Sequence, residues 1–343
     1  MKREEIEASK VAEGRDRQKT AVEFGTVRRF FTASRLRAFG VEALGLTTFY
    51  VLVIIFFSVA APHFLTYSNT LAILSTVTLI GIVSIGQALA IISGGFDLSV
   101  SGTVPLGAVL FAVLINHGVP VSLAIVLATL SGSTVGLVNG LIVTRLGINP
   151  LITTLGTLSV ATGLAYTVTN GQTVALKDLN AGVLANIAFG GISYYVIALL
   201  LFAVLSFFLL RNTVFGRMLY AIGGNREASR LAGLRIDLIT ATVYVLSGSL
   251  AAFAGVIIAS ELLAGTPTVG SDAALSSIAA VILGGAALTG GVGGIPGTLV
   301  GVLVLGTIAN GMALLAVPSF YQQIATGAVL LLAVGFGRLR TLL

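Results

Sequence analysis

Asp97 is the first candidate for chemistry, because it stands alone in a long uncharged stretch. No other Asp or Glu lies between Glu42 and Asp178. A carboxylate within a lipid bilayer costs about 2.5–3.5 kcal/mol on insertion scales, so such residues usually face a cavity or a partner. A glycine pair at 94–95 precedes Asp97 and could unwind a helix there. The sequence therefore predicts that Asp97 binds hydroxyl groups of a polar solute or braces a pore; the alternative is an aspartate that caps a helix.

Neutral polar side chains within the uncharged stretches form a second set of candidates for a solute path. In a membrane protein each such group is, as the alternative, a hydrogen-bonding group between helices. These candidates are Gln87, Ser93, Asn139, Asn310, Gln322 and Gln323.

No catalytic or metal-binding constellation is expected. Cysteine is absent, and the two histidines, His63 and His117, are too far apart in sequence for a local metal motif. Serine proteolysis would need a Ser–His pair at membrane depth, whereas both histidines fall in predicted outer turns. A phosphate-binding loop needs Gly-x4-Gly-Lys-Ser/Thr, and no lysine follows a glycine pair. The chain is therefore expected to hold no catalytic site, no metal and no cofactor of its own.

The polar segment 211–237 is the longest one between apolar stretches. Its Gly-Gly-Asn turn at 223–225 is suited to cap a short helix that begins near Arg226. Small residues on one exposed side of that helix would let a soluble protein approach closely, and the charged residues would give polar contacts. The alternative is an ordinary cytoplasmic loop that follows the charge rule. The docking candidates are Arg226, Glu227, Ala228, Ser229 and Gly233.

The composition of the chain indicates that the candidate residues are held by helices that cross a lipid bilayer. Hydrophobic residues make up 56% of the 343 residues and charged residues only 9%, whereas soluble domains have about 25% charged residues. Long uncharged runs favour helices, because the strands of a membrane barrel alternate every second residue. The predicted fold class is an all-α integral membrane protein.

Gaps between charged and turn-forming residues predict about ten transmembrane helices. With the N- and C-termini in the cytoplasm, eighteen of the nineteen Lys and Arg residues fall inside, as the positive-inside rule requires. Only Lys177 falls outside. The predicted spans lie near 44–61, 70–92, 100–116, 121–144, 148–169, 193–210 and 238–260, with three more in 273–337, broken at 290–296 and at 318–319.

Residues 1–43 form a charged cytoplasmic segment, and 44–343 form the membrane domain. The stretch 27–44 mixes arginines with phenylalanines and leucines, which predicts an interfacial basic helix. The formal charge of +6 comes from such inner segments and does not indicate nucleic-acid binding.

Two sets of glycines repeat at intervals of four residues, which is the spacing of close helix–helix packing. Similar surroundings of the two sets suggest two weakly related halves, as in many transporters. The sets are Gly132, Gly136 and Gly140, and Gly293, Gly297 and Gly301.

The residues of the polar loop carry a resemblance to a known family. Glu-Ala-Ser-x3-Gly at 227–233 resembles the Glu-Ala-Ala-x3-Gly coupling motif of ABC importer permeases, with Ser229 at the second alanine. Further blocks resemble the ribose and simple-sugar class of these permeases, in the family's order; the long charged N-terminus is the main departure. They are SGGFDLSVSG at 93–102, GLVNGLIVTRLGINPLITTLGT at 136–157, GRMLYAIGGNREASRLAGLRI at 216–236, GGVGGIPGTLVG at 290–301 and NGMALLAVPSFYQQIATGAVLLLAV at 310–334.

The resemblance implies a multi-pass protein of the bacterial inner membrane that imports a sugar or similar small polar solute. Two permease copies, identical or related, would form the pore, and partner ATPase subunits would bind ATP and Mg. A periplasmic binding protein would deliver the solute. Residues 226–233 would receive the motion of the ATPase.

Two other functions stay open at this point. One is a branched-chain amino-acid permease of the same transporter class. The other is an ion-coupled secondary transporter, which needs charged groups near the bilayer midplane and here has only Asp97 as a candidate. The sequence does not identify the solute.

Overall fold

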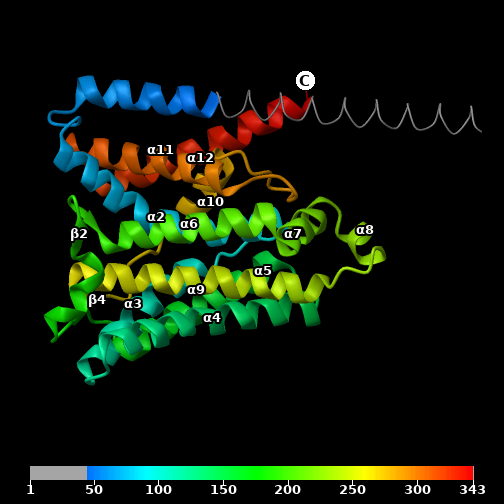
Figure 1. The fold of residues 1–343 in the computed structure, drawn as a ribbon, viewed down its shortest axis with the longest axis horizontal. Helices are drawn as coiled ribbons and strands as arrows, with labels where there is room; N and C mark the ends of the chain where they lie inside the picture. The colour runs from blue at the N-terminus through cyan, green and yellow to red at the C-terminus, as the bar shows by residue number, and fades with distance from the viewer. Residues whose placement is uncertain (1–44, 343) are drawn as a thin grey trace, which may run out of the picture. The chain divides into compact units, whose positions relative to one another are not determined.

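The computed structural model describes residues 45–342, and they are mainly helical (Figure 1). The chain divides into two compact units, Met1–Thr48 and Phe49–Leu343, and the account below concerns the second. The predicted interfacial helix at 27–44 lies outside the described residues. The helices are Gly45–Ala60, α2 Tyr67–Ile92, α3 Val100–Asn116, α4 Val121–Arg145, α5 Pro150–Thr169, α6 Tyr194–Asn212, α7 Val214–Gly224, α8 Arg226–Leu231, α9 Ile236–Leu262, α10 Ala273–Leu283, α11 Ile295–Leu314 and α12 Ser319–Leu342.

Six helices among the described residues are long and apolar enough to cross a membrane: α2, α4, α5, α6, α9 and α11. Gly45–Ala60, α3 and α10 are apolar but shorter. The three helices predicted in 273–337 correspond to α10, α11 and α12, but α10 has only 11 residues and a full span needs about 20, so the count of ten spans stays a prediction. Helix α10 ends at Leu283, before the predicted break at 290–296, and Gly285 beyond its cap takes a left-handed conformation with φ +89°.

The loop at 170–193 is more ordered than an all-α fold predicts. It contains a 3-10 helix, η1 Leu179–Ala185, and three short strands, β1 Val174–Ala175, β2 Ile187–Phe189 and β3 Ile192–Ser193. Strand β1 pairs antiparallel with β4 Ala264–Gly265, and β2 pairs with β3 in a hairpin. These pairs satisfy backbone groups at one end of the helices, where β2 and β4 lie together in Figure 1.

Helices α4 and α9 pack with their backbones in close contact. A methyl group on Gly132 would lie 2.1 Å from the Gly248 carbonyl oxygen, and one on Gly136 would lie 2.0 Å from the Tyr244 oxygen. Gly140 meets Ala241 in the same way. Because the contacts run in opposite directions along the two helices, α4 and α9 are antiparallel. The first glycine set thus forms one helix–helix interface.

The second glycine set is used differently. Gly297 and Gly301 of α11 approach the carbonyl oxygens of Gly284 and Ala280, which belong to the neighbouring α10 and its end. Gly293 lies before α11, has φ +136° and packs against Ala286. The stripe therefore covers two residues on the helix instead of three. The two sets do not meet equivalent partners, so the two related halves stay a prediction.

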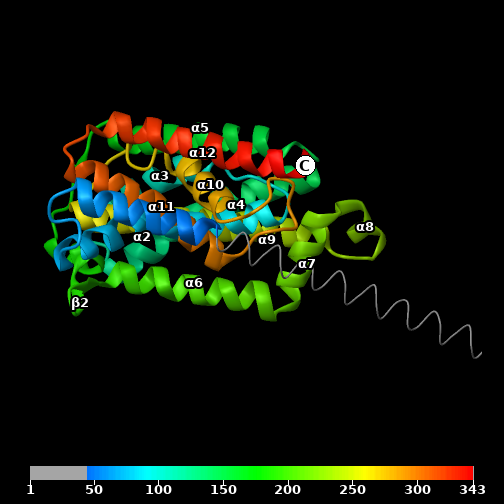
Figure 2. The same cartoon turned by 90° about the horizontal axis from the view of Figure 1, so that it is seen from above.

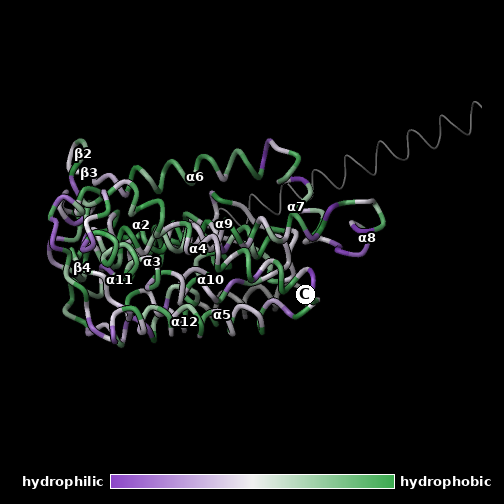
Figure 3. Tube along the Cα trace, turned by 90° about the horizontal axis from the view of Figure 1, so that it is seen from below, coloured by the Kyte–Doolittle hydropathy of each residue, from purple (hydrophilic) through white to green (hydrophobic). Residues whose placement is uncertain are grey.

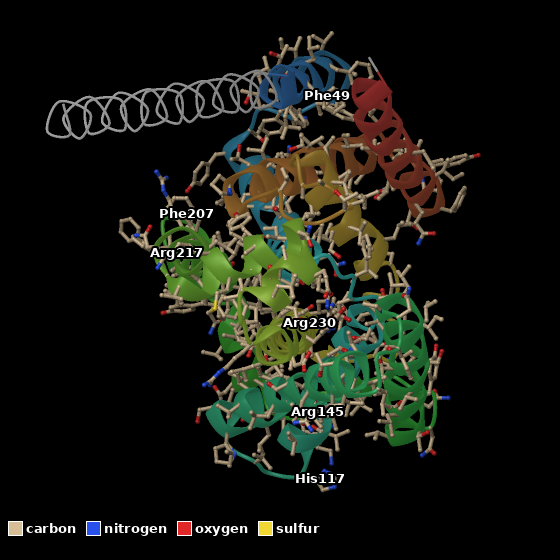
Figure 4. The ribbon with its side chains drawn as sticks, turned by 90° about the vertical axis from the view of Figure 1, so that its right-hand side faces the viewer. Phe49, His117, Arg145, Phe207, Arg217 and Arg230 are labelled. Atoms are coloured by element: carbon tan, nitrogen blue, oxygen red, sulfur yellow. The ribbon has the colours of Figure 1, made fainter. Side chains whose placement is uncertain are left out.

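The two ends of the bundle differ in charge. Helix α8 projects from one end, and the strands lie at the other (Figure 2). Polar residues gather at these ends, whereas α6 is apolar along most of its length (Figure 3). Figure 4 looks onto the end with α8, where Arg145, Arg217 and Arg230 are labelled. Lys177 lies at the opposite end, beside β1.

Several helices end in the same hydrogen-bonded closure, in which a left-handed residue follows the last turn. At the end of α2, Gly94 N donates to Ile91 O and Gly95 N donates to Ala90 O. Helix α11 ends this way with a non-glycine residue, Ala316, at φ +55°. Its N–H donates to Ala313 O, and the next N–H, from Val317, donates to Met312 O.

Candidate functional site

The segment between α6 and α9 is a folded projection and not an open loop. Helices α7 and α8 occupy most of it. Thr213 caps the start of α7 by accepting a hydrogen bond from Gly216 N at 3.2 Å. Asn225 ends α7 and also begins α8, where its Oδ1 accepts from Ala228 N at 2.9 Å. The predicted start of a helix near Arg226 agrees with this structure, because an Asn side chain is well suited to satisfy a free N–H of the first turn.

Helix α8 presents most of its candidate docking residues to solvent. Arg226, Glu227, Ala228 and Arg230 are exposed. Ser229 differs from the expectation, because it is only 5% exposed and points into the protein. A six-residue helix has one inner side, and position 229 lies on it. The exposed docking surface of α8 therefore consists of charged residues and Ala228, and the Ser229 hydroxyl is not part of it.

Gly233 has a conformational role that the sequence pattern did not predict. It ends α8 with φ +77°. Its N–H donates to Arg230 O at 3.0 Å, and the next N–H, from Leu234, donates to Ser229 O at 3.1 Å. A methyl group at Gly233 would meet nothing within 4 Å. The position is open for the approach of a partner, and it also needs a residue that tolerates the left-handed region.

Leu231 is a candidate that sequence reasoning missed. It is the last residue of α8 and is 83% exposed. A large apolar side chain at the tip of a charged projection loses contact with water when a partner covers it, which favours binding. The sequence does contain a signal for Leu231, because it is an apolar residue that directly follows charged residues in a polar segment. The docking motif consists of the small and charged residues and does not include Leu231.

Asp97 and Asn139, two of the predicted solute-path residues, belong to one buried hydrogen-bond network. Oδ1 of Asp97 accepts from the backbone N–H of Ser99 at 3.1 Å and from its hydroxyl. Nδ2 of Asn139 on α4 donates to the Ser99 hydroxyl at 2.8 Å. The hydroxyl of Thr157 on α5 donates to Asn139 Oδ1 at 2.6 Å. The network therefore ties the connection between α2 and α3 to both α4 and α5.

The burial of Asp97 and Asn139 helps to decide whether they contact the solute or hold neighbouring helices together. Asp97 and Asn139 are both fully buried within the single chain. The geometry of Asp97, whose carboxylate accepts from a residue two positions on, is that of a turn-capping aspartate. In this conformation the network can hold the α2–α3 connection in place, and a role in the solute path stays a prediction.

The other solute-path candidates lie on separate helices. Gln87 on α2 is fully buried, and its amide has no hydrogen-bond partner among the described residues. The Ser93 hydroxyl donates to Ala90 O at 2.7 Å at the end of α2. Asn310 on α11 is half-buried, and Gln322 on α12 donates from Nε2 to Val317 O at 3.2 Å. Gln323 is exposed. No hydrogen bond between described residues joins this group to the Asp97 network.

The residues described above are suited to docking a partner protein on α8 and to holding the α2–α3 connection in place. Within residues 45–342, no group of three or more His, Asp or Glu side chains is placed to hold a metal ion. The two constellations that the structure does bring together are the exposed face of α8 and the buried network around Asp97. Helix α7 leads into α8, and its end contacts the end of α2, which the Asp97 network follows.

Comparison with known proteins places this architecture in a family. Residues 69–334 match the family model described as the permease component of branched-chain amino acid transport systems. The chain is 42% identical over 283 residues to the L-arabinose ABC transporter permease protein AraH of Azospirillum brasilense, covering 82% of this chain and 84% of that protein.

Two further relatives have similar coverage. The ribose import permease protein RbsC of Bacillus subtilis is 40% identical over 287 residues, which is 83% of this chain and 89% of the relative. The L-arabinose transport system permease protein AraH of Escherichia coli K12 is 35% identical over 297 residues, which is 87% and 90%. No solved structure matches the chain. The chain belongs to this family of transporter permeases, and its relatives there include permeases named for arabinose and ribose.

Proposed function

We propose that this chain is the pore-forming permease subunit of an ATP-driven importer for a pentose or a similar small polyhydroxylated solute in the bacterial inner membrane. The observation that carries the proposal is α8, a short capped helix that projects from one end of an apolar helix bundle. In an importer of this class the permease needs such a projection, because the ATPase subunit is a separate protein in the cytoplasm.

The exposed side of α8 is suited to receive that ATPase. Arg226, Glu227 and Arg230 can make polar contacts in a partner cleft, and Leu231 can fill an apolar pocket there. ATP and Mg would be bound by the partner. The contribution of this chain is to convert the movement of α8 into a movement of its membrane helices.

The orientation follows from the distribution of charge. Five arginines lie between residues 211 and 235, and Arg145 lies at the adjoining end of α4. Positively charged segments favour the cytoplasmic side, so this end would be cytoplasmic and the end with the strands periplasmic. About ten membrane segments with both termini inside agree with this orientation. In that count α10 and the connection at 284–294 together form one broken segment.

The proposal includes three kinds of partner. A second permease copy, identical or related, would complete the pore. Two ATPase subunits would bind beneath it, one at each α8. A periplasmic binding protein would deliver the solute to the end that carries β1–β4 and η1. Because such a binding protein selects the solute, the permease itself needs few specific contacts to it.

The names of the relatives favour a sugar over an amino acid. The family description mentions branched-chain amino acids, but relatives that cover more than four fifths of the chain are named for arabinose or ribose. Blocks such as the one at 93–102 also resemble the sugar class. A pentose is therefore the first solute to test.

The test is reconstitution in liposomes with the partner ATPase and the periplasmic binding protein that the proposal requires. Uptake of labelled L-arabinose, D-ribose and L-leucine is measured with and without ATP inside the vesicles. We expect ATP-dependent uptake of a pentose and none of leucine. Uptake of leucine would reassign the solute class. Uptake by this chain alone, driven by a proton or sodium gradient, would contradict the proposal and favour a secondary transporter.

A further inference from the structure

Three segments that are far apart in sequence meet at a point where no side chains separate their backbones. They are the end of α2, the end of α7, and the connection between α10 and α11. We name this point the glycine junction, and it consists of Gly94, Gly223, Gly290 and Gly291.

The contacts at the glycine junction are closer than any side chain would allow. A methyl group on Gly223 would lie 1.9 Å from the Ile92 carbonyl oxygen and 2.5 Å from the Gly291 nitrogen. A methyl group on Gly290 would lie 2.7 Å from Gly94 Cα. Gly94, Gly290 and Gly291 have φ values between +73° and +87°, which favour glycine.

Two hydrogen bonds hold the junction together. Gly291 N donates to Ile92 O at 2.9 Å and so joins the α10–α11 connection to α2. The hydroxyl of Tyr220 on α7 donates to Gly293 O at 2.9 Å. A tyrosine hydroxyl is protonated and able to donate at neutral pH, and burial raises the pKa of Tyr220 further above its usual value.

Helix α7 leads from this junction directly to α8. Asn225 is both the last cap of α7 and the first cap of α8, so no flexible linker separates the two helices. Ile222 and Leu219 bury the other side of α7 in the core. A displacement of α8 therefore has no free chain in which to be absorbed.

We propose that the glycine junction passes the displacement of α8 to α2 and to the α10–α11 connection, with Tyr220 and Gly223 as the positioning residues. This inference rests on the proposed role of α8 as the ATPase docking helix. Backbones in direct contact transmit a push, because no side chain between them can change rotamer to absorb it. The hydrogen bonds transmit a pull, and a transport cycle needs both directions.

The test compares two neighbouring glycines that differ in their surroundings. Gly223→Ala places a methyl group against Ile92 O, whereas a methyl group on Gly224 meets nothing within 4 Å. Both changes raise helix propensity equally, so Gly224→Ala is the matched control. The full transporter is reconstituted, and solute uptake per ATP hydrolysed is measured together with copurification of the ATPase.

We expect Gly223→Ala to retain the ATPase and to lower uptake per ATP by roughly two- to thirtyfold, the usual range for a change in coupling. Gly224→Ala should keep the wild-type ratio. Tyr220→Phe removes the hydrogen bond to Gly293 O but keeps the packing of the ring, so it should also lower uptake per ATP. This variant tests the junction even if Gly223→Ala does not accumulate in the membrane. A wild-type ratio in Tyr220→Phe and in any folded Gly223→Ala protein would overturn the junction.

A third variant separates this inference from the proposed function. Leu231→Asp alters only the exposed tip of α8 and should abolish copurification of the ATPase. If it does so while Gly223→Ala transports normally, the docking role stands and the junction is wrong. If Leu231→Asp binds the ATPase and transports normally, the docking role of α8 itself is wrong.

A separate observation concerns the hairpin of β2 and β3 at the other end of the bundle. Phe189 at its turn is 85% exposed, Ile187 is 67% exposed, and neighbouring Tyr67 is 68% exposed. The Tyr67 hydroxyl donates to Gly190 O and fixes the hairpin beside α2. Residues 186–194 contain no charged side chain.

The hairpin continues the apolar outer surface of α6. It leads directly into α6 at Tyr194, and the α6 trace is hydrophobic along most of its length in Figure 3. The exposed large apolar side chains of α6 include Leu200, Val204 and Phe208. We infer that the hairpin occupies the lipid headgroup region of the outer leaflet, with the Phe189 ring toward the acyl chains. Tyrosine favours this region of a membrane, and the exposed Tyr67 and Tyr194 lie beside the hairpin. The continuity with α6 favours lipid over a soluble partner.

The absence of tryptophan from the chain makes this site measurable. Phe189→Trp and Leu179→Trp each introduce a single tryptophan; Leu179 is 74% exposed but follows Lys177 and Asp178. In vesicles of brominated phosphatidylcholine we expect quenching of Trp at 189 and not at 179, and the reverse with iodide. Iodide quenching at 189 would favour a soluble partner, and protection from both quenchers would favour a second copy; either result overturns the inference.

Discussion

At the scale of single residues, two separate requirements favour glycine at position 233. The resemblance to the coupling motif implies that a partner approaches closely there, and the structure shows that the backbone is left-handed, with φ +77°. A bulky replacement would therefore disturb the end of α8 whether or not a partner binds there. A useful test must keep the backbone conformation while adding a side chain.

Asn and Val separate the two requirements at Gly233. Asn tolerates the left-handed region, whereas a β-branched residue there is strained by more than about 1 kcal/mol. If the backbone is what matters, Gly233→Asn should transport normally and Gly233→Val should lose ATPase binding. If close approach is what matters, both should fail in copurification of the ATPase. Normal transport by Gly233→Val would show that neither requirement applies.

The Asp97 network gives a second prediction at this scale. Asn139→Leu removes the hydrogen bonds to Ser99 and Thr157 together, and leaving buried polar groups unpaired costs about 1–3 kcal/mol. Thr157→Val removes only one of these bonds. We expect Asn139→Leu to lower the thermal midpoint in detergent more than Thr157→Val does. Equal midpoints for Asn139→Leu and the wild type would mean that the network does not brace the α2–α3 connection.

Among the candidate residues, what the sequence could predict depended on local chemistry. Asn225 is a cap by its side chain alone, so the start of α8 was predictable. The burial of Ser229 depends on how α8 leans on the rest of the chain, and no local pattern carries that information. The same holds for the network around Asp97, because Ser99, which bonds Asp97, also accepts from Asn139, 40 positions away on another helix.

At the scale of helices, charge gaps predicted most boundaries closely. The predicted spans at 100–116 and 121–144 correspond to α3 and α4. The early end of α10 has a physical cause: the stretch 284–294 contains several glycines, and each could end a helix. The closure at Gly285 lies beside a close backbone contact of Gly284 with Gly297, which is a tertiary contact that no local pattern reveals.

The pairing of α4 with α9 leads to a prediction at this scale. Gly136→Leu would force the two backbones apart, because even a methyl group would lie 2.0 Å from Tyr244 O. We expect little folded protein in the membrane, measured by size-exclusion chromatography of the solubilised chain. Gly156→Leu on α5 is the control, since nothing lies within 4 Å of that position. Equal yields of the two variants would mean that this interface is not needed for folding.

At the scale of the whole molecule, the two ends of the bundle should face different compartments. The chain has no cysteine, so single cysteines can be introduced without background. Cysteines at Arg145 and Asn225 should react only from the cytoplasm, and those at Leu65, Asn180 and Thr268 only from outside, because all five positions are exposed at their respective ends. Labelling of 225 from outside by an impermeant maleimide would reject the proposed orientation.

The alanine that closes α11 has a consequence for protein engineering. Ala316 holds a left-handed conformation that costs a residue with a Cβ atom roughly 1 kcal/mol or more, and glycine avoids this strain. Ala316→Gly should therefore raise the midpoint of detergent denaturation slightly without touching α8 or the glycine junction. A lower midpoint would show that the backbone entropy of glycine outweighs the relieved strain. If the midpoint rises, the variant is a sturdier starting material for determining the structure of the assembled transporter.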